Sequence, residues 1–139
     1  LGDISSLHEI IPTFAHLPVP VVFDHFGHIA AKKGINDPGF IAMLRLLGEG
    51  RAWVKLSGAY RLGATDGGHG EAVNRLATAL VAANPDHLVW GSDWPHPAID
   101  GPMPNDGYVM DDLARWVPGP PLRERILVKN PSRLYGFDD

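Results

Sequence analysis

The sequence predicts an α/β fold, namely the carboxyl-terminal half of a (β/α)8 barrel made of its last three βα units and the terminal helices. Apolar segments typical of buried strands alternate with helical segments, and the strands recur about every 34 residues, the usual length of one βα unit. Polar side chains follow each strand, as they do at the mouth of such a barrel. An open three-layer α/β sandwich of few strands is the alternative arrangement of the same units.

We expect residues 1–139 to form a single partial domain, a half-barrel from which the amino-terminal strands are absent. A complete barrel needs eight strands and typically about 250 residues, which is more than this chain supplies. A half-barrel has two unpaired sheet edges, and open edges of this kind promote association with another chain.

The chain is expected to open with a helix over residues 6–15, because Ser6 and Glu9 have the spacing of a capping box and apolar residues follow at helical spacing. Prolines end this segment. The first strand is predicted over residues 19–24. It is apolar on both faces, which is typical of a parallel strand that is covered on both sides.

A second helix is predicted over residues 38–47, because Asp37 and the proline after it fit the N-cap and the first helical position. Glycines end this helix, and the second strand is expected over residues 52–57. A glycine-rich loop at residues 63–70 then leads into a long helix over residues 71–83.

The last third of the chain carries the third strand, over residues 87–91, and a proline-rich loop over residues 95–104. Helical patterns follow this loop to the end of the chain. They predict helices at residues 108–116, 122–127 and 130–136.

Composition excludes several classes of protein. The formal net charge is −4 and the 12 lysines and arginines are scattered, so the sequence has no basic patch for nucleic acid or for an anionic membrane surface. The absence of cysteine excludes disulfides and thiolate metal sites and is typical of a cytoplasmic protein. No apolar run approaches the roughly 20 residues that cross a bilayer. We therefore expect a cytoplasmic protein that acts on a small molecule.

Asp93, His25 and Arg61 follow three successive strand segments and are the main candidates for chemistry. Hydrolysis of a lactone or amide needs a base that deprotonates water, a group that stabilises the developing oxyanion, and a positive group that holds an anionic substrate. A carboxylate, an imidazole and a guanidinium suit these tasks, and the planar guanidinium matches a carboxylate. Each residue also has a structural alternative: a turn cap for Asp93, a core position for His25 and a surface position for Arg61.

Further candidates for substrate contacts lie close to the same strand ends: His28, His96 and Tyr60. Both histidines can instead support the residues that touch the substrate. For Tyr60 and for Trp94, packing at the barrel mouth is favoured over contact with the substrate, because aromatic side chains fill such positions more often than they bind ligands.

Four motifs occur in a characteristic order along the chain: Asp24–Gly27, Lys55–Arg61, Gly91–His96 and Asn130–Phe137. Together they resemble the carboxyl-terminal half of the amidohydrolase superfamily. More specifically, they resemble the lactonase-like branch of this superfamily, which contains 2-pyrone-4,6-dicarboxylate lactonase and related sugar-lactone hydrolases. It covers nearly the whole chain and implies the last strands of a (β/α)8 barrel.

The resemblance also implies roles for the matching residues. Asp93 occupies the place of the general base that activates water, His25 that of the histidine that polarises the scissile carbonyl, and Arg61 that of the arginine that binds a substrate carboxylate. In metal-dependent relatives such a histidine ligates the metal, so His25 and Asp93 are the ligands expected if a Zn²⁺ or Mn²⁺ ion is present. The His-x-His pair of the family's opening strand has no counterpart in this sequence.

The resulting prediction is a metal-independent hydrolase, without a cofactor, that acts on a lactone or a related ester or amide bond in a small carboxylated or sugar-derived substrate. One alternative is a metal-dependent amidohydrolase or decarboxylase of aromatic acids, although a catalytic zinc site wants about three protein ligands. The other alternative is a catalytically inactive half-barrel that associates with further copies of itself through its open sheet edges.

Overall fold

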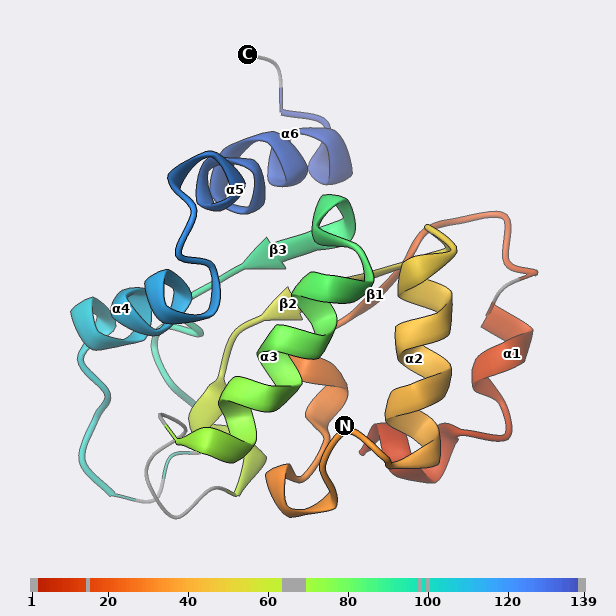
Figure 1. The fold of residues 1–139 in the computed structure, drawn as a ribbon, viewed down its shortest axis with the longest axis horizontal. Helices are drawn as coiled ribbons and strands as arrows, with labels where there is room; N and C mark the ends of the chain where they lie inside the picture. Colours follow the sequence, from red (N-terminus) through yellow and green to blue (C-terminus); the bar gives the residue numbers. More distant parts are fainter. Residues whose placement is uncertain (1–2, 15, 64–69, 98, 100, 138–139) are drawn as a thin grey trace.

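Three parallel strands form the sheet at the centre of the molecule (Figure 1). The computed structural model describes residues 3–14, 16–63, 70–97, 99 and 101–137. The strand order is β1-β2-β3, so neighbours in the sequence are also neighbours in the sheet, as in successive βα units. Each predicted strand is present but shorter than expected. The strands are β1 (Val21–Phe23), β2 (Ala52–Leu56) and β3 (Leu88–Trp90).

Helices make up most of the remaining fold, and α3 has the bounds that the sequence predicts. The α-helices are α1 (Ile11–Phe14), α2 (Pro38–Gly48), α3 (Glu71–Ala83), α4 (Asp106–Trp116), α5 (Pro120–Glu124) and α6 (Asn130–Tyr135). Short 3-10 helices lie at Ile4–Leu7, His25–His28, Ala31–Lys33, Ala59–Leu62 and Pro85–His87, and a π-helical turn at Arg125–Lys129 joins α5 to α6.

The opening of the chain differs from the prediction of one helix over residues 6–15. A 3-10 turn and the single turn α1 stand there instead, and Asp3 rather than Ser6 is the N-cap, accepting the backbone N–H of Ser5 at 2.9 Å. Pro12 accounts for the break, because a proline lacks the N–H that would bond four residues back and its ring clashes with that carbonyl. Most of the predicted glycine-rich loop, residues 64–69, lies outside the described residues.

The start of α2 confirms the predicted cap. The Asp37 carboxylate accepts the backbone N–H groups of Gly39 at 2.9 Å and Phe40 at 3.1 Å. Pro38 takes the first helical position, where no backbone donor is needed. Two of the free donors at the helix start are thereby satisfied, which fixes where the loop after β1 ends.

The sheet face that α2 and α3 cover is apolar and closed to solvent (Figure 1). Ala52, Val54 and Leu56 alternate along β2 toward the helices and are fully buried. Val54 is paired with Phe23 on one side and with Leu88 on the other, so the three strands share this core. The helices contribute further buried side chains: Phe40, Met43, Leu47, Val73, Leu76 and Leu80.

The opposite face of β1 is more exposed than predicted for a strand covered on both sides. Val22, which lies on this face, is 37% exposed. Lys55 on β2 faces the same way and carries its charge along this surface, beside the carboxyl ends of the strands. The polar residues beside the strand ends therefore adjoin this second face of the sheet, which lies opposite α2 and α3.

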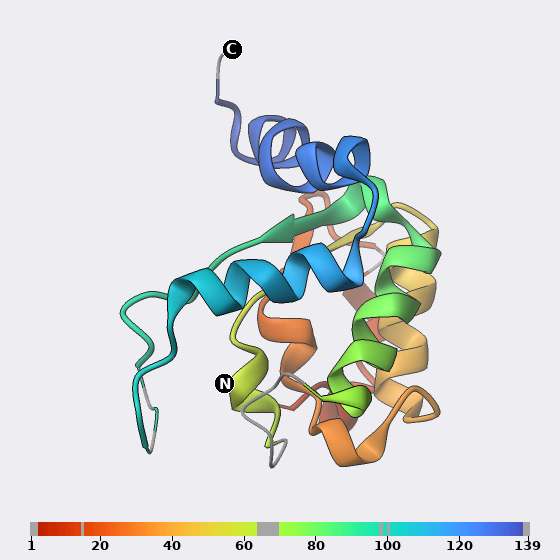
Figure 2. The same ribbon diagram turned by 60° about the vertical axis from the view of Figure 1, so that its left-hand side comes forward.

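α4 packs against α3, and the terminal helical segments pack against β3. In Figure 2, α4 runs from the loop after β3 toward α3, and α5 and α6 lie beyond β3. Trp116 of α4 donates from Nε1 to Oδ1 of Asn74 at 2.9 Å. Asn130 donates from Nδ2 to the backbone oxygens of Leu88 at 2.6 Å and Pro85 at 2.9 Å, so it caps the outer edge of β3. Within the part of the chain described, no helix is long and apolar enough to cross a membrane.

Candidate active site

Asp93, His25, Tyr60 and Arg61 converge where the three strands end. Arg61 donates from Nε to Oδ2 of Asp93 at 2.5 Å, and the Tyr60 hydroxyl donates to the same oxygen at 2.6 Å. The other oxygen, Oδ1, lies 3.7 Å from Nε2 of His25. The structure therefore brings together residues that are 32 and 33 positions apart in the sequence, because parallel strands end at the same edge of the sheet.

Gly58 makes this convergence possible. It follows β2 with φ +58°, a left-handed conformation that glycine adopts without steric cost. A Cβ at this position would lie 2.9 Å from Nδ1 of His25, 3.0 Å from Cδ of Arg61 and 3.1 Å from Oδ2 of Asp93. The three candidate side chains thus close over a backbone position that only glycine fits.

The turns that present these side chains are conformationally strained. Non-glycine residues with positive φ cost of order 1–3 kcal/mol each and are typical of functional sites. In the described residues they occur only in the two turns that follow β1 and β3: His25, Phe26, His28, Asp93 and His96. Buried Phe26, whose ring meets that of Trp116 edge-on at 5.4 Å, anchors the first of these turns in the core.

His25 and His28 lie together in the first turn, with ring centroids 4.8 Å apart. Nδ1 of His25 lies 2.8 Å from the hydroxyl of buried Ser57, which orients the imidazole toward Asp93. Burial lowers the pKa of His25, although the Asp93 charge opposes this effect. Burial and the neighbouring His25 also lower the pKa of His28, whose Nε2 is buried without a partner among the residues described.

The Asp93 carboxylate is 11% exposed and remains ionised because of its donors. Burial raises its pKa, but the hydrogen bonds from Tyr60 and Arg61 outweigh burial, so the pKa lies below its ordinary value. Burial, together with the same contact with Asp93, raises the pKa of Tyr60 to about 12. Tyr60 therefore acts as a hydrogen-bond donor at neutral pH.

An ion pair between Lys55 and Asp24 lies beside the site, with Nζ 2.6 Å from Oδ1. Burial lowers the pKa of Lys55, but its contact with Asp24 more than compensates and the pKa is raised. Lys55 and Ser57 are not among the site residues that the sequence predicts. The signal for Lys55 is a lysine within an otherwise apolar strand, because such a charge needs a partner on the strand face that it occupies.

The ring of His96 packs against the ring of Tyr60. The side chain of His96 is fully buried, its ring centroid lies 5.7 Å from that of Tyr60, and its Nε2 lies 3.0 Å from Oδ1 of Asp106. Trp94 is 73% exposed among the described residues, and its packing at the barrel mouth stays a prediction. Its backbone N–H donates to the hydroxyl of Ser92 at 3.2 Å.

Metal ligands are scarce in this arrangement. His25 and Asp93 are the two groups that could hold an ion, and the described residues contain no cluster of three or more side chains suited to a metal. A divalent cation at Asp93 would also compete with the guanidinium of Arg61 for Oδ2. The donor set of this chain by itself thus falls short of the about three protein ligands of a catalytic zinc site.

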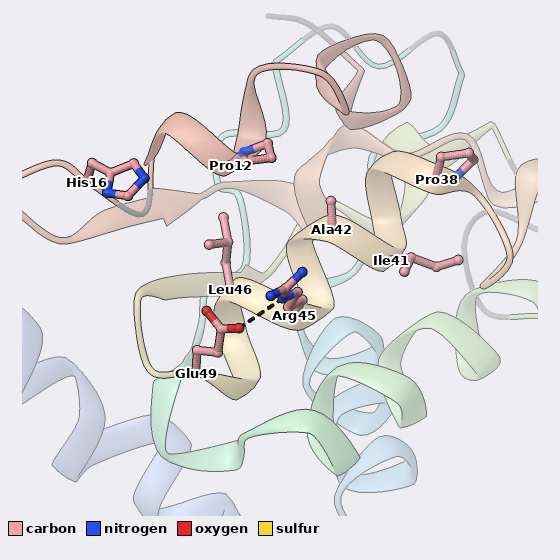
Figure 3. Close-up of a pocket in the computed structure, with 8 residues that line it drawn as sticks. All are labelled: Pro12, His16, Pro38, Ile41, Ala42, Arg45, Leu46 and Glu49. Carbon is pink, nitrogen blue, oxygen red and sulfur yellow. Dashed lines mark hydrogen bonds and ion pairs between the residues drawn. The ribbon is translucent and has the colours of Figure 1, made fainter.

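A separate hollow of about 420 Å³ lies between α1 and α2 (Figure 3). Its polar groups are His16 and an ion pair in which Arg45 donates from Nε to Glu49 at 2.9 Å. None of the residues at the strand ends lines this hollow. It therefore offers no arrangement of acid, base and cation comparable with that around Asp93.

Comparison with known proteins places these residues in a family context. The family model described as amidohydrolase matches residues 2–137. The chain is 37% identical over 134 residues to a 4-sulfomuconolactone hydrolase of Hydrogenophaga intermedia and 36% identical over 138 residues to a 2-pyrone-4,6-dicarboxylate hydrolase of Comamonas testosteroni. These alignments cover 95% and 94% of the chain.

A solved structure gives the same relationship. It is that of a probable 2-pyrone-4,6-dicarboxylic acid hydrolase from Acinetobacter baumannii with citric acid bound, which is 31% identical and superposes with a TM-score of 0.83. The match covers 98% of this chain and 51% of the other. The chain spans 44% and 45% of the length of the two curated relatives, so it corresponds to about half of each.

Proposed function

The chain belongs to the amidohydrolase family, and we propose that its protein hydrolyses a lactone that carries an anionic group. The two curated relatives are both named as hydrolases, one of a sulfonated lactone and one of a pyrone dicarboxylate. The observation that carries the proposal is the convergence of Asp93, His25 and Arg61 at the strand ends. We further propose that the three-stranded sheet is the carboxyl-terminal half of a (β/α)8 barrel, because the superposed hydrolase from Acinetobacter baumannii is matched over half its length.

The proposed reaction begins at Asp93. Its ionised carboxylate takes a proton from a water molecule, and the resulting hydroxide adds to the lactone carbonyl. The ring C–O bond then breaks, and the proton passes to the ring oxygen that leaves. His25 lies 3.7 Å from Asp93, and we assign it to the carbonyl oxygen, where negative charge develops.

Arg61 is the proposed binding group for the anionic part of the substrate. A guanidinium matches a carboxylate or sulfonate through parallel hydrogen bonds. Citric acid, bound in the superposed structure, is itself a polycarboxylate. Since Arg61 donates to Asp93 in this structure, the substrate's anionic group must share Arg61 with the base or take it over.

We propose that the reaction proceeds without a metal. Oδ2 of Asp93 already accepts hydrogen bonds from Arg61 and Tyr60, which provide the positive environment that a cation would otherwise supply. We also propose a small molecule as the partner, since the net charge of −4 and the scattered basic residues do not favour nucleic acid.

The test is Asp93→Asn in the protein at its full natural length, assayed with lactones that carry carboxylate or sulfonate groups. We expect kcat to fall by about 10²–10⁴-fold, the usual contribution of a general base, with KM nearly unchanged because the amide keeps the size of the carboxylate. Asp111→Asn, on the exposed side of α4, is the matched control and keeps wild-type rates. Near wild-type turnover by Asp93→Asn would remove Asp93 from the mechanism.

Metal analysis tests the second part of the proposal. We expect wild-type activity after treatment with a chelator and no stoichiometric metal in the purified protein. About one equivalent of Zn²⁺ or Mn²⁺, with activity lost to chelator and restored by the ion, would replace the metal-independent mechanism by a metal-dependent one.

A further inference from the structure

Ser57 is a buried serine at the carboxyl end of β2. It follows Leu56 directly, and the alternation of side chains along the strand places it on the same face as Lys55, opposite α2 and α3. The backbone N–H of Gly91 donates to the backbone oxygen of Leu56 at 3.4 Å, so the pairing of β2 with β3 continues up to this serine. The sheet therefore sets the position of Ser57.

The hydroxyl of Ser57 forms a hydrogen bond with the imidazole of His25. Oγ lies 2.8 Å from Nδ1, across 32 positions of the sequence. Within the part of the chain that the structure describes, this is the one hydrogen bond of the hydroxyl. A buried O–H needs an acceptor, and Nδ1 is the acceptor that it meets, so the hydroxyl donates and Nδ1 accepts.

Gly58, the next residue, allows the ring to come this close. It has a φ of +58°, and a Cβ at this position would lie 2.9 Å from Nδ1 of His25. Ser57 and Gly58 thus act on the same ring nitrogen, one as a donor and the other by leaving space. Packing alone accounts for the glycine but not for the hydroxyl beside it.

The bond at Nδ1 determines which ring atom faces Asp93. A neutral imidazole has one N–H, so an Nδ1 that accepts leaves the proton on Nε2. Nε2 lies 3.7 Å from Oδ1 of Asp93, and a negative carboxylate favours an N–H on the side that faces it. A flip of the ring would put Cδ2 in place of Nδ1 and Cε1 in place of Nε2, and it would break the bond to Ser57.

Nε2 of His25 is accessible from the site. The side chains of His25 and Asp93 are 14% and 11% exposed. Nε2 is not among the described polar atoms that are sealed from solvent without a partner, in contrast to Nε2 of His28 and Nδ1 of His96. At 3.7 Å it is too far from Asp93 for a hydrogen bond, so its N–H is free to bind a ligand that reaches Asp93.

We propose that Ser57 is a positioning residue, which donates a hydrogen bond to Nδ1 of His25 and thereby presents Nε2–H to the carbonyl oxygen of the substrate. No proton is transferred in this contact, and the N–H stabilises the negative charge that develops on the oxygen. The inference rests on the proposed function for the identity of that oxygen, whereas the bond between Ser57 and His25 is a property of the chain itself.

Histidine nitrogens labelled with ¹⁵N test the direction of this bond, in the protein at its full natural length and without substrate. At a pH where the ring is neutral, we expect Nε2 of His25 to carry the proton and Nδ1 to show the resonance of a hydrogen-bonded acceptor. Ser57→Ala should move the Nδ1 resonance to that of a free acceptor, and Ser57→Thr should restore it because it returns a hydroxyl. A wild-type ring with its proton on Nδ1, or an Nδ1 resonance that Ser57→Ala leaves unchanged, would overturn the proposal.

Kinetics test whether the bond matters for the reaction. Removal of an oxyanion donor costs about 10²–10³-fold in kcat, and we expect loss of its positioning partner in Ser57→Ala to cost about 10–100-fold. KM should stay nearly unchanged, because Arg61 still holds the anionic group of the substrate. Wild-type kcat in a Ser57→Ala protein that has lost the bond would refute the positioning role. A wild-type protein that hydrolyses no lactone would refute the proposed function, while the resonances would still decide the bond.

Ser92→Ala is the matched control. Ser92 also lies just after a strand, but its hydroxyl accepts the backbone N–H of Trp94 at 3.2 Å instead of bonding an imidazole. We expect this variant to keep the wild-type resonances of His25. If Ser92→Ala moves the Nδ1 resonance as far as Ser57→Ala does, the change reports a general disturbance of the strand ends and the assignment to Ser57 is wrong.

Discussion

At the carboxyl ends of the strands the backbone is strained and the side chains are charged, whereas the amino ends carry stacked rings and hydrogen-bonded backbone. The non-glycine residues with positive φ in the described chain all lie at the carboxyl ends, around Asp93 and His25. At the amino ends, Trp53 stacks on His87 with ring centroids 4.4 Å apart, and the guanidinium of Arg133 lies 4.9 Å from the Trp53 ring.

We infer from this difference that the proposed chemistry lies at the carboxyl ends of the strands and that the contacts at the amino ends stabilise the sheet. Strained turns and crowded charges reduce stability, and they persist because the surrounding structure holds them. That structure consists of the apolar layer under α2 and α3 and of the contacts at the amino ends, such as the bonds from Asn130 to Leu88 and Pro85. Substitutions at the carboxyl ends should accordingly lower activity, with or without a loss of stability, whereas substitutions at the amino ends should lower stability alone.

Gly58→Ala is expected to have the largest effect, and it tests the crowded carboxyl ends of the strands. The new Cβ would meet His25, Arg61 and Asp93 within 2.9–3.1 Å at a φ of +58°. We expect a loss of ~2–4 kcal/mol in the free energy of unfolding, from left-handed strain and overpacking together. Displacement of the three side chains should lower kcat/KM by about 100-fold. Urea denaturation and lactone assays measure the two effects.

Gly63→Ala is the control for this variant. Gly63 has a φ of +68°, but among the described residues nothing lies within 4 Å of its Cβ position. Only the conformational cost of about 1–2 kcal/mol should remain, and kcat/KM should stay near the wild-type value. Equal destabilisation by the two alanines, with activity kept in both, would show that the three side chains do not depend on the space above Gly58.

Asn130→Ala tests the opposite end of the sheet. The variant leaves the backbone oxygens of Leu88 and Pro85 without their amide donor. We expect a loss of about 1–3 kcal/mol in the free energy of unfolding, with kcat and KM unchanged. Ser132→Ala, which removes an exposed hydrogen bond to the Phe137 oxygen, should cost far less. An Asn130→Ala protein of wild-type stability but low activity would reverse the assignment of the two ends.

Local signals made most of the secondary structure predictable. The pair Asp37 and Pro38 marks a helix start through donors that need a partner, and the structure confirms the cap. The long helix 71–83 has a strong apolar period and is found with the same bounds. The prediction of an opening helix is wrong because it rests on the capping-box spacing at Ser6 and leaves out Pro12. The proline lacks a backbone N–H donor, so the helix is interrupted there.

The residues of the candidate site could be predicted from the sequence, but the hydrogen bonds between them could not. Polar residues after apolar strands pointed to Asp93, His25 and Arg61, because parallel strands end at one edge. Nothing in the sequence shows that Arg61 and Tyr60 share one oxygen of Asp93, since this depends on side-chain conformations in three separate turns. The pairing of His96 with Asp106 is not predictable for the same reason, as the two residues lie ten positions apart in the sequence.

The smallest expected effect is a pH dependence of stability that arises at the carboxyl ends alone. Burial lowers the pKa of both His25 and His28 in the folded protein. Below the ordinary histidine value of about 6.5 the unfolded chain therefore binds more protons than the folded one, and the free energy of unfolding falls as the pH drops from 7 to 5. The lowered pKa of Asp93 has no effect in this window, because its contribution to the free energy of unfolding is lost only below its ordinary value of 3.8.

Urea midpoints at pH 7 and pH 5 should differ less in His25→Gln and His28→Gln than in the wild type, whereas the exposed His16→Gln should keep the wild-type difference. A wild-type midpoint that does not change between these pH values would mean that neither histidine is desolvated by folding.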